Sequence, residues 1–237
     1  YEDHWHTGQL VWALLEAGAV LDRLDLVAAA RRGGDWWVST EFPQGHPLAG
    51  LVAAAHGDRL GELINWTTIA DGTPGLFALT RATGDPRYAD TATRSGRWLW
   101  ANTRVPADTP GGAGLFYNII DPATGEVWRD WDVHTQGPRR DAAKAASAPA
   151  PVTRAARPNI EGFLFHDMCR HTGEQVWCDR FIAQADALLA RQHPSGLWLE
   201  FEPNEADGSQ IHPRFNIWNA EALLQAYEIS RDRKYLE

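Results

Sequence analysis

Apolar residues recur at helical spacing along most of the chain, as they do at Phe181, Ala185 and Leu188. This periodicity predicts paired helices, with a short turn inside each pair. The first six predicted helices form three helical hairpins, and the seventh opens a fourth. The predicted helices cover residues 8–18, 26–40, 64–83, 86–103, 159–172, 175–192 and 215–230.

A six-residue joint follows the first helix of several pairs, at 83–88, 172–177 and 230–235. Gly84 and Gly173 can adopt the left-handed conformation that ends a helix. An acidic residue comes next, where the unpaired N–H groups of a new helix favour negative charge. Each copy closes on an aromatic residue. A repeat at this spacing indicates an array of similar helical units.

Long links join one hairpin to the next, which places the long links at one end of the bundle and the short turns at the other. These links cover 41–63, 104–158 and 193–214. Two of them contain a similar strand-like segment, at 114–118 and 196–200. The first continues through a turn at 121–125 to 126–128, which predicts a β-hairpin.

Paired helices with their long loops at one end resemble the α/α toroid, in which inner helices form a barrel inside a ring of outer helices. The three joints, residues 70–77 and the two Gly-Leu-aromatic segments are similar to the six-hairpin glycosidase superfamily. That superfamily includes unsaturated glucuronyl hydrolases, β-L-arabinofuranosidases and sugar epimerases. The resemblance implies an all-α fold, an incomplete barrel of helical hairpins with short β-hairpins in the long loops.

Residues 1–237 are expected to form one domain that continues beyond both ends of the chain. Six hairpins of this repeat length need roughly 350 residues, and this chain supplies about four.

Composition narrows the class of protein. The formal net charge of −9 argues against a nucleic-acid partner, because phosphate binding needs a basic face. No run of about 18 apolar residues is present, so no membrane span is expected. No phosphate-binding loop, dinucleotide fingerprint, zinc motif or serine nucleophile motif occurs, so no cofactor and no metal are expected. The oligomeric state and the cellular compartment stay open.

The two cysteines, Cys169 and Cys178, lie almost symmetrically about the joint at 172–177. They could face each other across the hairpin. Two buried free thiols are the favoured interpretation.

Carboxylates near the starts of inner helices are the first catalytic candidates. Glycoside cleavage needs one carboxyl group as acid and another as base or nucleophile. Asp71 and Glu161 fit the ionised partner, since a helix N-terminus stabilises a carboxylate. Asp132 and His134 form a second candidate pair, as acid or proton relay. The alternative interpretation is a helix-capping acid for the first two residues and a solvated loop for the others.

Polar and aromatic residues concentrate where the long links meet the inner helices. The 12 tryptophans matter here, because an indole face matches the apolar face of a sugar ring. Those at the cleft end are expected to stack on sugars: Trp5, Trp66, Trp128, Trp131, Trp198 and Trp218. The others, embedded in helices, are expected to fill the core. The predicted substrate-binding residues are His4, His6, Trp66, Trp131, Arg157, Asn159, His212, Arg214, Asn216 and Trp218.

Charge narrows the substrate. The segment 129–157 has six basic residues against three acidic ones, inside a chain that is net acidic. Arginine binds carboxylates through two parallel hydrogen bonds, so this pattern favours a uronic acid. Arg157 and Arg214 are expected to converge on that carboxylate, and a solvated basic loop is the alternative interpretation.

The resulting hypothesis is a glycoside hydrolase that acts on an acidic oligosaccharide or polysaccharide. The main alternative is a polysaccharide lyase that removes the proton next to a uronate carboxyl group. His134, His212 or Tyr117 would be its base, and Arg157 or Asn159 would neutralise the carboxylate.

Three other functions are weaker alternatives. A sugar epimerase would use paired histidines such as His4 and His212, and a glycan-binding scaffold would leave its ligand intact. The segment 192–198 fits a Q-x-x-x-G-x-W pattern of triterpene cyclases, but the Asp-rich stretch that those enzymes use for protonation is absent.

Overall fold

The computed structural model describes residues 3–54, 63–129, 156–158, 163–199 and 213–237, and the backbone alone of 131–132 and 137–138. Within these residues the chain is mostly helical. The α-helices are α1 His4–Leu21, α2 Leu24–Ser39, α3 Trp66–Thr83, α4 Arg87–Asn102, α6 Leu164–Thr172, α7 Gln175–Leu189 and α8 Pro213–Ser230, and a short 3₁₀ helix, η3, covers Arg233–Leu236. No described helix is long and apolar enough to cross a membrane.

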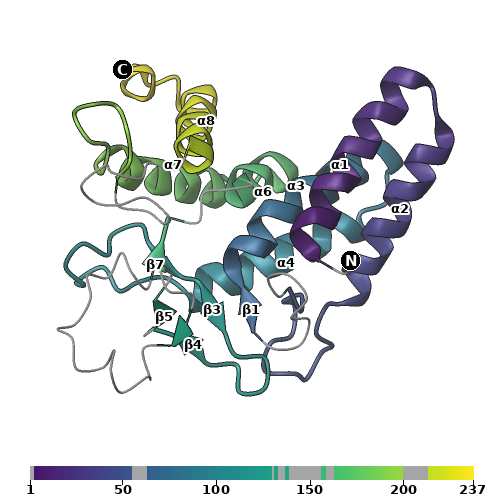
Figure 1. The fold of residues 1–237 in the computed structure, drawn as a ribbon, viewed down its shortest axis with the longest axis horizontal. Coiled ribbons are helices and arrows are strands. Elements are labelled where there is room, and N and C mark those ends of the chain that lie inside the picture. Colours follow the sequence, from purple (N-terminus) through teal and green to yellow (C-terminus); the bar gives the residue numbers. More distant parts are fainter. Residues whose placement is uncertain are drawn as a thin grey trace.

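The helices pair as antiparallel hairpins, α1 with α2, α3 with α4, and α6 with α7 (Figure 1). Helix α3 lies among α1, α2, α4 and α6. Most of its residues are buried, from Trp66 to Leu79, as expected of an inner helix. Helices α1 and α8 leave apolar residues exposed, including Leu10 and Ile217. The predicted row of helical hairpins is confirmed.

Short strands lie together on one side of the helices (Figure 1). They are β1 Ile64–Asn65, β2 Phe116–Tyr117, β3 Ile119–Ile120, β4 Val127–Trp128, β5 Trp131–Asp132, β6 Gly137–Pro138 and β7 Ala156–Arg157. All the described pairings are antiparallel: β1–β3–β4 form one sheet, β2 pairs with β7, and β5 pairs with β6. The predicted turn at 121–125 closes a β-hairpin, the β3–β4 pair, with a hydrogen bond from the Gly125 amide to the Asp121 carbonyl. The predicted first segment, 114–118, differs: its strand β2 pairs with β7.

The second strand-like segment does not form a strand in its described part, 196–199. The backbone of Trp198 bonds to a side chain of α8 instead of to another strand. Its amide donates to Asn216 Oδ1 at 2.8 Å, and its carbonyl accepts from Asn216 Nδ2 at 3.3 Å. The strand prediction was wrong here, because the asparagine amide group takes the place of a strand partner.

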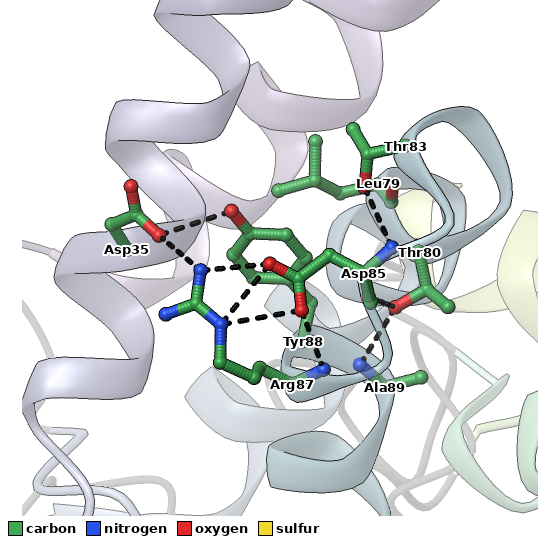
Figure 2. A network of polar contacts seen from close by, with 8 residues as sticks. All are labelled: Asp35, Leu79, Thr80, Thr83, Asp85, Arg87, Tyr88 and Ala89. Atoms are coloured by element: carbon green, nitrogen blue, oxygen red, sulfur yellow. Dashed lines mark hydrogen bonds and ion pairs between the residues drawn. The ribbon is translucent and has the colours of Figure 1, made fainter.

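The repeated joints share one pattern of hydrogen bonds. The hydroxyl groups of Thr83, Thr172 and Ser230 donate to the carbonyl one turn earlier, at 2.7, 2.8 and 2.7 Å. Each hydroxyl also accepts the amide N–H two residues further on. Figure 2 shows this arrangement at Thr83. Gly84 and Gly173 have φ values of 72° and 67°, as the sequence predicted.

The aromatic residue of each joint is buried and faces the outer helix of the preceding hairpin. The Tyr88 hydroxyl donates to Asp35 Oδ1 on α2 at 3.0 Å (Figure 2). The Tyr235 hydroxyl donates to Asp186 Oδ1 on α7 at 2.6 Å. The same contact therefore fastens two different hairpins to their neighbours.

The middle joint makes the corresponding contact with its charges exchanged. Its acid, Glu174, accepts from Arg97 of α4 at 2.5 Å, and the Arg97 guanidinium carbon lies 5.3 Å from the ring centroid of Trp177. In the other two joints the cation is on the joint itself: Arg87 pairs with Asp35, and Lys234 pairs with Asp186. All three joints therefore form an ion pair with the preceding outer helix, but in the middle joint the acidic partner is on the joint and the basic partner is on the helix.

Cys169 on α6 and Cys178 on α7 form a disulfide, with their Cα atoms 4.8 Å apart. The interpretation as two free thiols was wrong. Only two residues separate α6 from α7, so the facing positions of the two helices lie within bonding distance.

Helices α1 and α3 cross in very close contact through glycine. A Cβ atom added to Gly75 would lie 2.1 Å from the Gly8 carbonyl oxygen, and one added to Gly8 would lie 2.1 Å from the Gly72 carbonyl oxygen. Any other residue would force the two backbones apart. This crossing places the first turn of α1 beside the second turn of α3.

Candidate functional site

The first turn of α1 contains a buried carboxylate beside an exposed histidine. Asp3 caps the helix, because its Oδ1 accepts the Trp5 amide N–H at 2.9 Å. Its other oxygen, Oδ2, lies 3.2 Å from His6 Nδ1. The exposed fraction of the side chain is 3% for Asp3 and 61% for His6. A buried carboxylate therefore contacts the Nδ1 edge of an accessible imidazole.

Trp5 links this pair to the start of α8. Its ring stacks on the His6 ring, with centroids 4.7 Å apart and an interplanar angle of 15°. The guanidinium carbon of Arg214 lies 4.8 Å from the Trp5 ring centroid and 4.7 Å from that of Trp218. Trp5 and Trp218 are both partly exposed. Two indole rings and one guanidinium group therefore gather between the first and the last α-helices.

A second arginine approaches the same place from β7. The guanidinium carbons of Arg157 and Arg214 lie 5.0 and 5.2 Å from the ring centroid of Phe215. Arg157 is 8% exposed, whereas Arg214 is exposed. The structure thus brings together the two arginines that were expected to converge. We call this group the Arg214 cluster, which consists of Asp3, Trp5, His6, Arg157, Arg214, Phe215 and Trp218.

Asp71 lies on α3 close to the first turn of α1. It is 5% exposed and sits in the second turn of its helix. A Cβ atom added to the next residue, Gly72, would lie 2.6 Å from the His4 carbonyl oxygen. The backbone next to Asp71 therefore packs against His4, which lies between Asp3 and His6 in the sequence. Its predicted catalytic role stays a prediction.

His4 has a structural position. It is fully buried, its Nε2 lies 2.7 Å from Thr40 Oγ1, and its ring packs on Trp36 and Trp37 at centroid distances of 4.5 and 4.7 Å. Burial lowers the pKa of His4 to about 3, because the charged imidazolium would lose its hydration. A neutral His4 therefore ties α1 to α2, and its ring is closed to a substrate.

Two tryptophans expected to stack on sugars are in the core. Trp66 is fully buried, and its Nε1 donates to Thr103 Oγ1 at 2.9 Å. Trp198 is 2% exposed, and its Nε1 donates to the Leu188 carbonyl at 2.9 Å. Asn216, a predicted substrate ligand, uses both ends of its side-chain amide to hold Trp198. These three residues support the framework of the site.

Several predicted site residues fall beyond what the structure describes. Trp131 and Asp132 are described by their backbone, which pairs with Pro138 and Gly137. The residues outside the described ranges are His134, Asn159, Glu161 and His212. Their proposed roles stay predictions.

The sequence analysis predicted that His6 binds substrate, but it did not predict the contact between His6 and Asp3. The signal was available in the sequence, since an Asp at a helix start with a polar residue three positions later is the spacing of a capping box. Among the described residues, no group of three or more His, Cys, Asp or Glu side chains could hold a metal ion.

Comparison with known proteins supports the fold. No family model and no curated protein matches the chain. A GH76 α-mannanase from Bacteroides thetaiotaomicron matches with a TM-score of 0.63 and 15% identity, over 99% of this chain and 54% of the mannanase. A cellobiose 2-epimerase from Bacillus thermoamylovorans matches with a TM-score of 0.65 and 14% identity, over 100% of this chain and 59% of the epimerase.

The chain thus spans a little more than half the length of both structures. At these identities the likeness concerns the fold, and it confirms the predicted α/α toroid of helical hairpins.

Proposed function

We propose that this protein is a carbohydrate-active enzyme, and that it acts as a glycoside hydrolase on glycans that contain uronic acid. The observation that carries the proposal is the placement of Arg214 between Trp5 and Trp218. The two structural neighbours, named as a mannanase and a cellobiose epimerase, support the carbohydrate class.

The Arg214 cluster has the chemistry that an acidic sugar requires. A sugar ring offers an apolar face to a partly exposed indole, and Trp218 supplies such a surface. The Trp5 ring next to it stacks on His6 and lies under Arg214. A guanidinium group can bind the sugar carboxylate through two parallel hydrogen bonds. Arg157, whose guanidinium carbon lies 5.0 Å from the Phe215 ring centroid, adds a second positive charge near the same point.

Hydrolysis requires carboxyl groups next to this binding surface. Asp71 is a candidate because its helix crosses α1 at Gly72, beside the first turn of α1. We assign it the role of the ionised base or nucleophile. The protonated partner is then Glu161 or Asp132, with His134 as a relay, as the sequence predicted.

A polysaccharide lyase is the second candidate, and one observation favours it. The Arg214 cluster joins two guanidinium groups with an accessible imidazole, on His6. Arginine neutralises a uronate carboxylate and thereby acidifies the neighbouring C–H bond, which a histidine can then deprotonate. A hydrolase would need the carboxyl pair instead.

A pair of product assays tests the proposal. The protein is incubated with uronate oligosaccharides and with matched neutral ones, and both reducing ends and ultraviolet absorbance are followed. New reducing ends from the uronate without absorbance indicate hydrolysis, and absorbance at the wavelength of an unsaturated uronate indicates elimination.

Two results would contradict the proposed function. Cleavage of the neutral glycans alone would remove the acidic-sugar assignment. Bound uronate that stays intact after long incubation would indicate a glycan-binding scaffold.

A further inference from the structure

The Asp3 carboxylate is used at both of its oxygens. Oδ1 accepts the Trp5 amide N–H that caps α1, and Oδ2 lies 3.2 Å from His6 Nδ1. The side chain is 3% exposed and therefore has little freedom to move. Its orientation is set by the helix start, so it presents a fixed acceptor to one nitrogen of the imidazole.

This contact favours one of the two neutral tautomers of the imidazole. A carboxylate beside Nδ1 favours the tautomer that carries its hydrogen on Nδ1, which leaves the lone pair on Nε2. The stacked ring of Trp5 limits the rotation of the His6 ring. Because the side chain is 61% exposed, its far nitrogen can be reached by a ligand.

We propose that His6 Nε2 accepts a proton in the reaction, and that Asp3 is the positioning residue that orients it. This inference rests on the proposed function. The reason is the position of Arg214, whose guanidinium lies on Trp5, the residue that also stacks on His6. Because Arg214 and His6 both contact the Trp5 ring, a sugar whose carboxylate binds Arg214 would lie near the imidazole.

The proton transfer balances in either candidate reaction. In hydrolysis, Asp71 bonds to the anomeric carbon while the glycosidic C–O bond breaks with its electron pair on the leaving oxygen, which a carboxyl group protonates. Water then attacks the anomeric carbon, the bond to Asp71 breaks, and the water proton moves to Nε2. Nε2 returns this proton to solvent, from which the carboxyl group is protonated again. In elimination, Nε2 takes the C5 proton, the C–H electron pair forms the C4–C5 double bond, and the C4–O bond breaks with its electron pair on the leaving oxygen. That oxygen takes a proton from water, and the hydroxide that remains takes the proton from Nε2.

A merely structural role for this pair makes different predictions. If Asp3 and His6 form only a helix cap, the cap resides in the Asp3 oxygen that binds Trp5. Asparagine caps helices about as well as aspartate, so Asp3→Asn would keep the helix start. His6 is exposed, so His6→Ala would then change neither stability nor turnover.

The tautomer is measured first, by ¹⁵N and ¹H NMR of the imidazole nitrogens near neutral pH. The wild-type protein should show the hydrogen of neutral His6 on Nδ1, and Asp3→Asn should shift the population toward the other tautomer. Equal tautomer populations in the two proteins would overturn the positioning role of Asp3, whether or not a substrate is known.

Turnover is measured next on the uronate oligosaccharide. His6→Ala should lower kcat by about a hundredfold or more, the usual contribution of a positioned base. Added imidazole should restore part of the rate, because it can enter the space left by the side chain. Asp3→Asn should lower kcat with little change in KM. His171→Ala removes another exposed histidine, on α6, and should keep wild-type kinetics.

The two proposals fail in distinguishable ways. An active wild-type enzyme whose His6→Ala variant keeps full turnover would overturn the role of His6 and leave the proposed function standing. A wild-type protein that cleaves no uronate glycan would overturn the proposed function and the catalytic role together, while the NMR result would still decide the role of Asp3.

Discussion

The guanidinium carbon of Arg214, at the start of α8, lies 4.8 Å from the ring centroid of Trp5, at the start of α1. More than 200 residues separate them in the sequence. Cation–π contacts of this kind contribute roughly 0.5–2 kcal/mol. A contact between distant helix starts gathers charged and aromatic groups into one place, which is what recognition of a ligand requires.

The α1–α3 crossing predicts a large effect of one methyl group. Gly75→Ala would place a Cβ atom 2.1 Å from the Gly8 carbonyl oxygen. This clash can be relieved only by moving the backbone of α1 or α3, which would disturb the packing of both helices. We expect the free energy of unfolding to fall by more than about 2 kcal/mol, although alanine favours a helix by roughly 1 kcal/mol. Urea unfolding measures it.

Gly33→Ala is the matched control for this prediction. There the added Cβ atom would meet a side-chain methyl group of Val11, which can move aside. The loss should be smaller than at Gly75. If Gly75→Ala is as stable as the wild type, the close crossing is not part of the folded protein.

The joint contact between Tyr88 and Asp35 predicts a measurable coupling. Tyr88→Phe and Asp35→Ala each remove the 3.0 Å hydrogen bond, so the double variant should be about 1 kcal/mol more stable than the sum of the two losses implies. A double-mutant cycle in urea gives this value. The equivalent cycle for Tyr235 and Asp186 should give a coupling of the same sign, and additive losses in both pairs would contradict a shared role.

The burial of His4 predicts an acid-sensitive stability. Its pKa is about 3 in the folded protein and near 6.5 in the unfolded chain, so the unfolded chain binds a proton first as the pH falls. The stabilisation is complete above pH 6.5 and is lost progressively toward pH 3. Between these limits the wild type should lose up to about 1.4 kcal/mol per pH unit more than His4→Gln.

Urea titrations at several values between pH 7.5 and 4 measure this difference. His171→Gln, which removes an exposed histidine, should keep the wild-type pH dependence. Parallel curves for wild type and His4→Gln would show that His4 is protonated in the folded state.

Asp71 offers the direct test of carboxylate catalysis. Asp71→Asn should lower turnover of the uronate substrate by about a hundredfold or more, with little change in stability, because the two side chains have nearly the same size. Asp186→Asn, on the outer helix α7, is the control and should keep wild-type turnover. Full activity of Asp71→Asn would remove Asp71 from the site and favour Asp132.

The joints could be predicted because their causes are local. Gly84 and Gly173 end their helices in the left-handed conformation, and the residues after them start the next helix within two or three positions. Such signals depend on backbone conformation over a few residues. The disulfide depends in addition on which positions face each other across the α6–α7 turn, and that cannot be read from spacing alone.

The candidate site could be predicted in part. Trp66 and Trp218 both lie near the starts of inner helices, yet one is fully buried and the other is partly exposed. The difference arises from tertiary packing, since Phe116 and Phe165 surround Trp66. The approach of Arg157 to Arg214 was expected from charge, whereas the aromatic ring that both of them contact, Phe215, was not.

The central claim is that the Arg214 cluster recognises the carboxylate of an acidic glycan. Arg214 tests it more cleanly than Arg157, because Arg214 is exposed and can be replaced with little effect on the core. Arg104→Gln is the control. Arg104 is also exposed and also lies over a tryptophan, Trp100, which belongs to the outer helix α4.

Calorimetric titration of paired uronate and neutral oligosaccharides into wild type, Arg214→Gln and Arg104→Gln gives the decisive measurement. Loss of a paired contact to a charged group should weaken uronate binding to Arg214→Gln by about a hundredfold and leave neutral binding unchanged. Arg104→Gln should match the wild type on both ligands. Equal losses on the two ligands, or none on the uronate, would contradict the account.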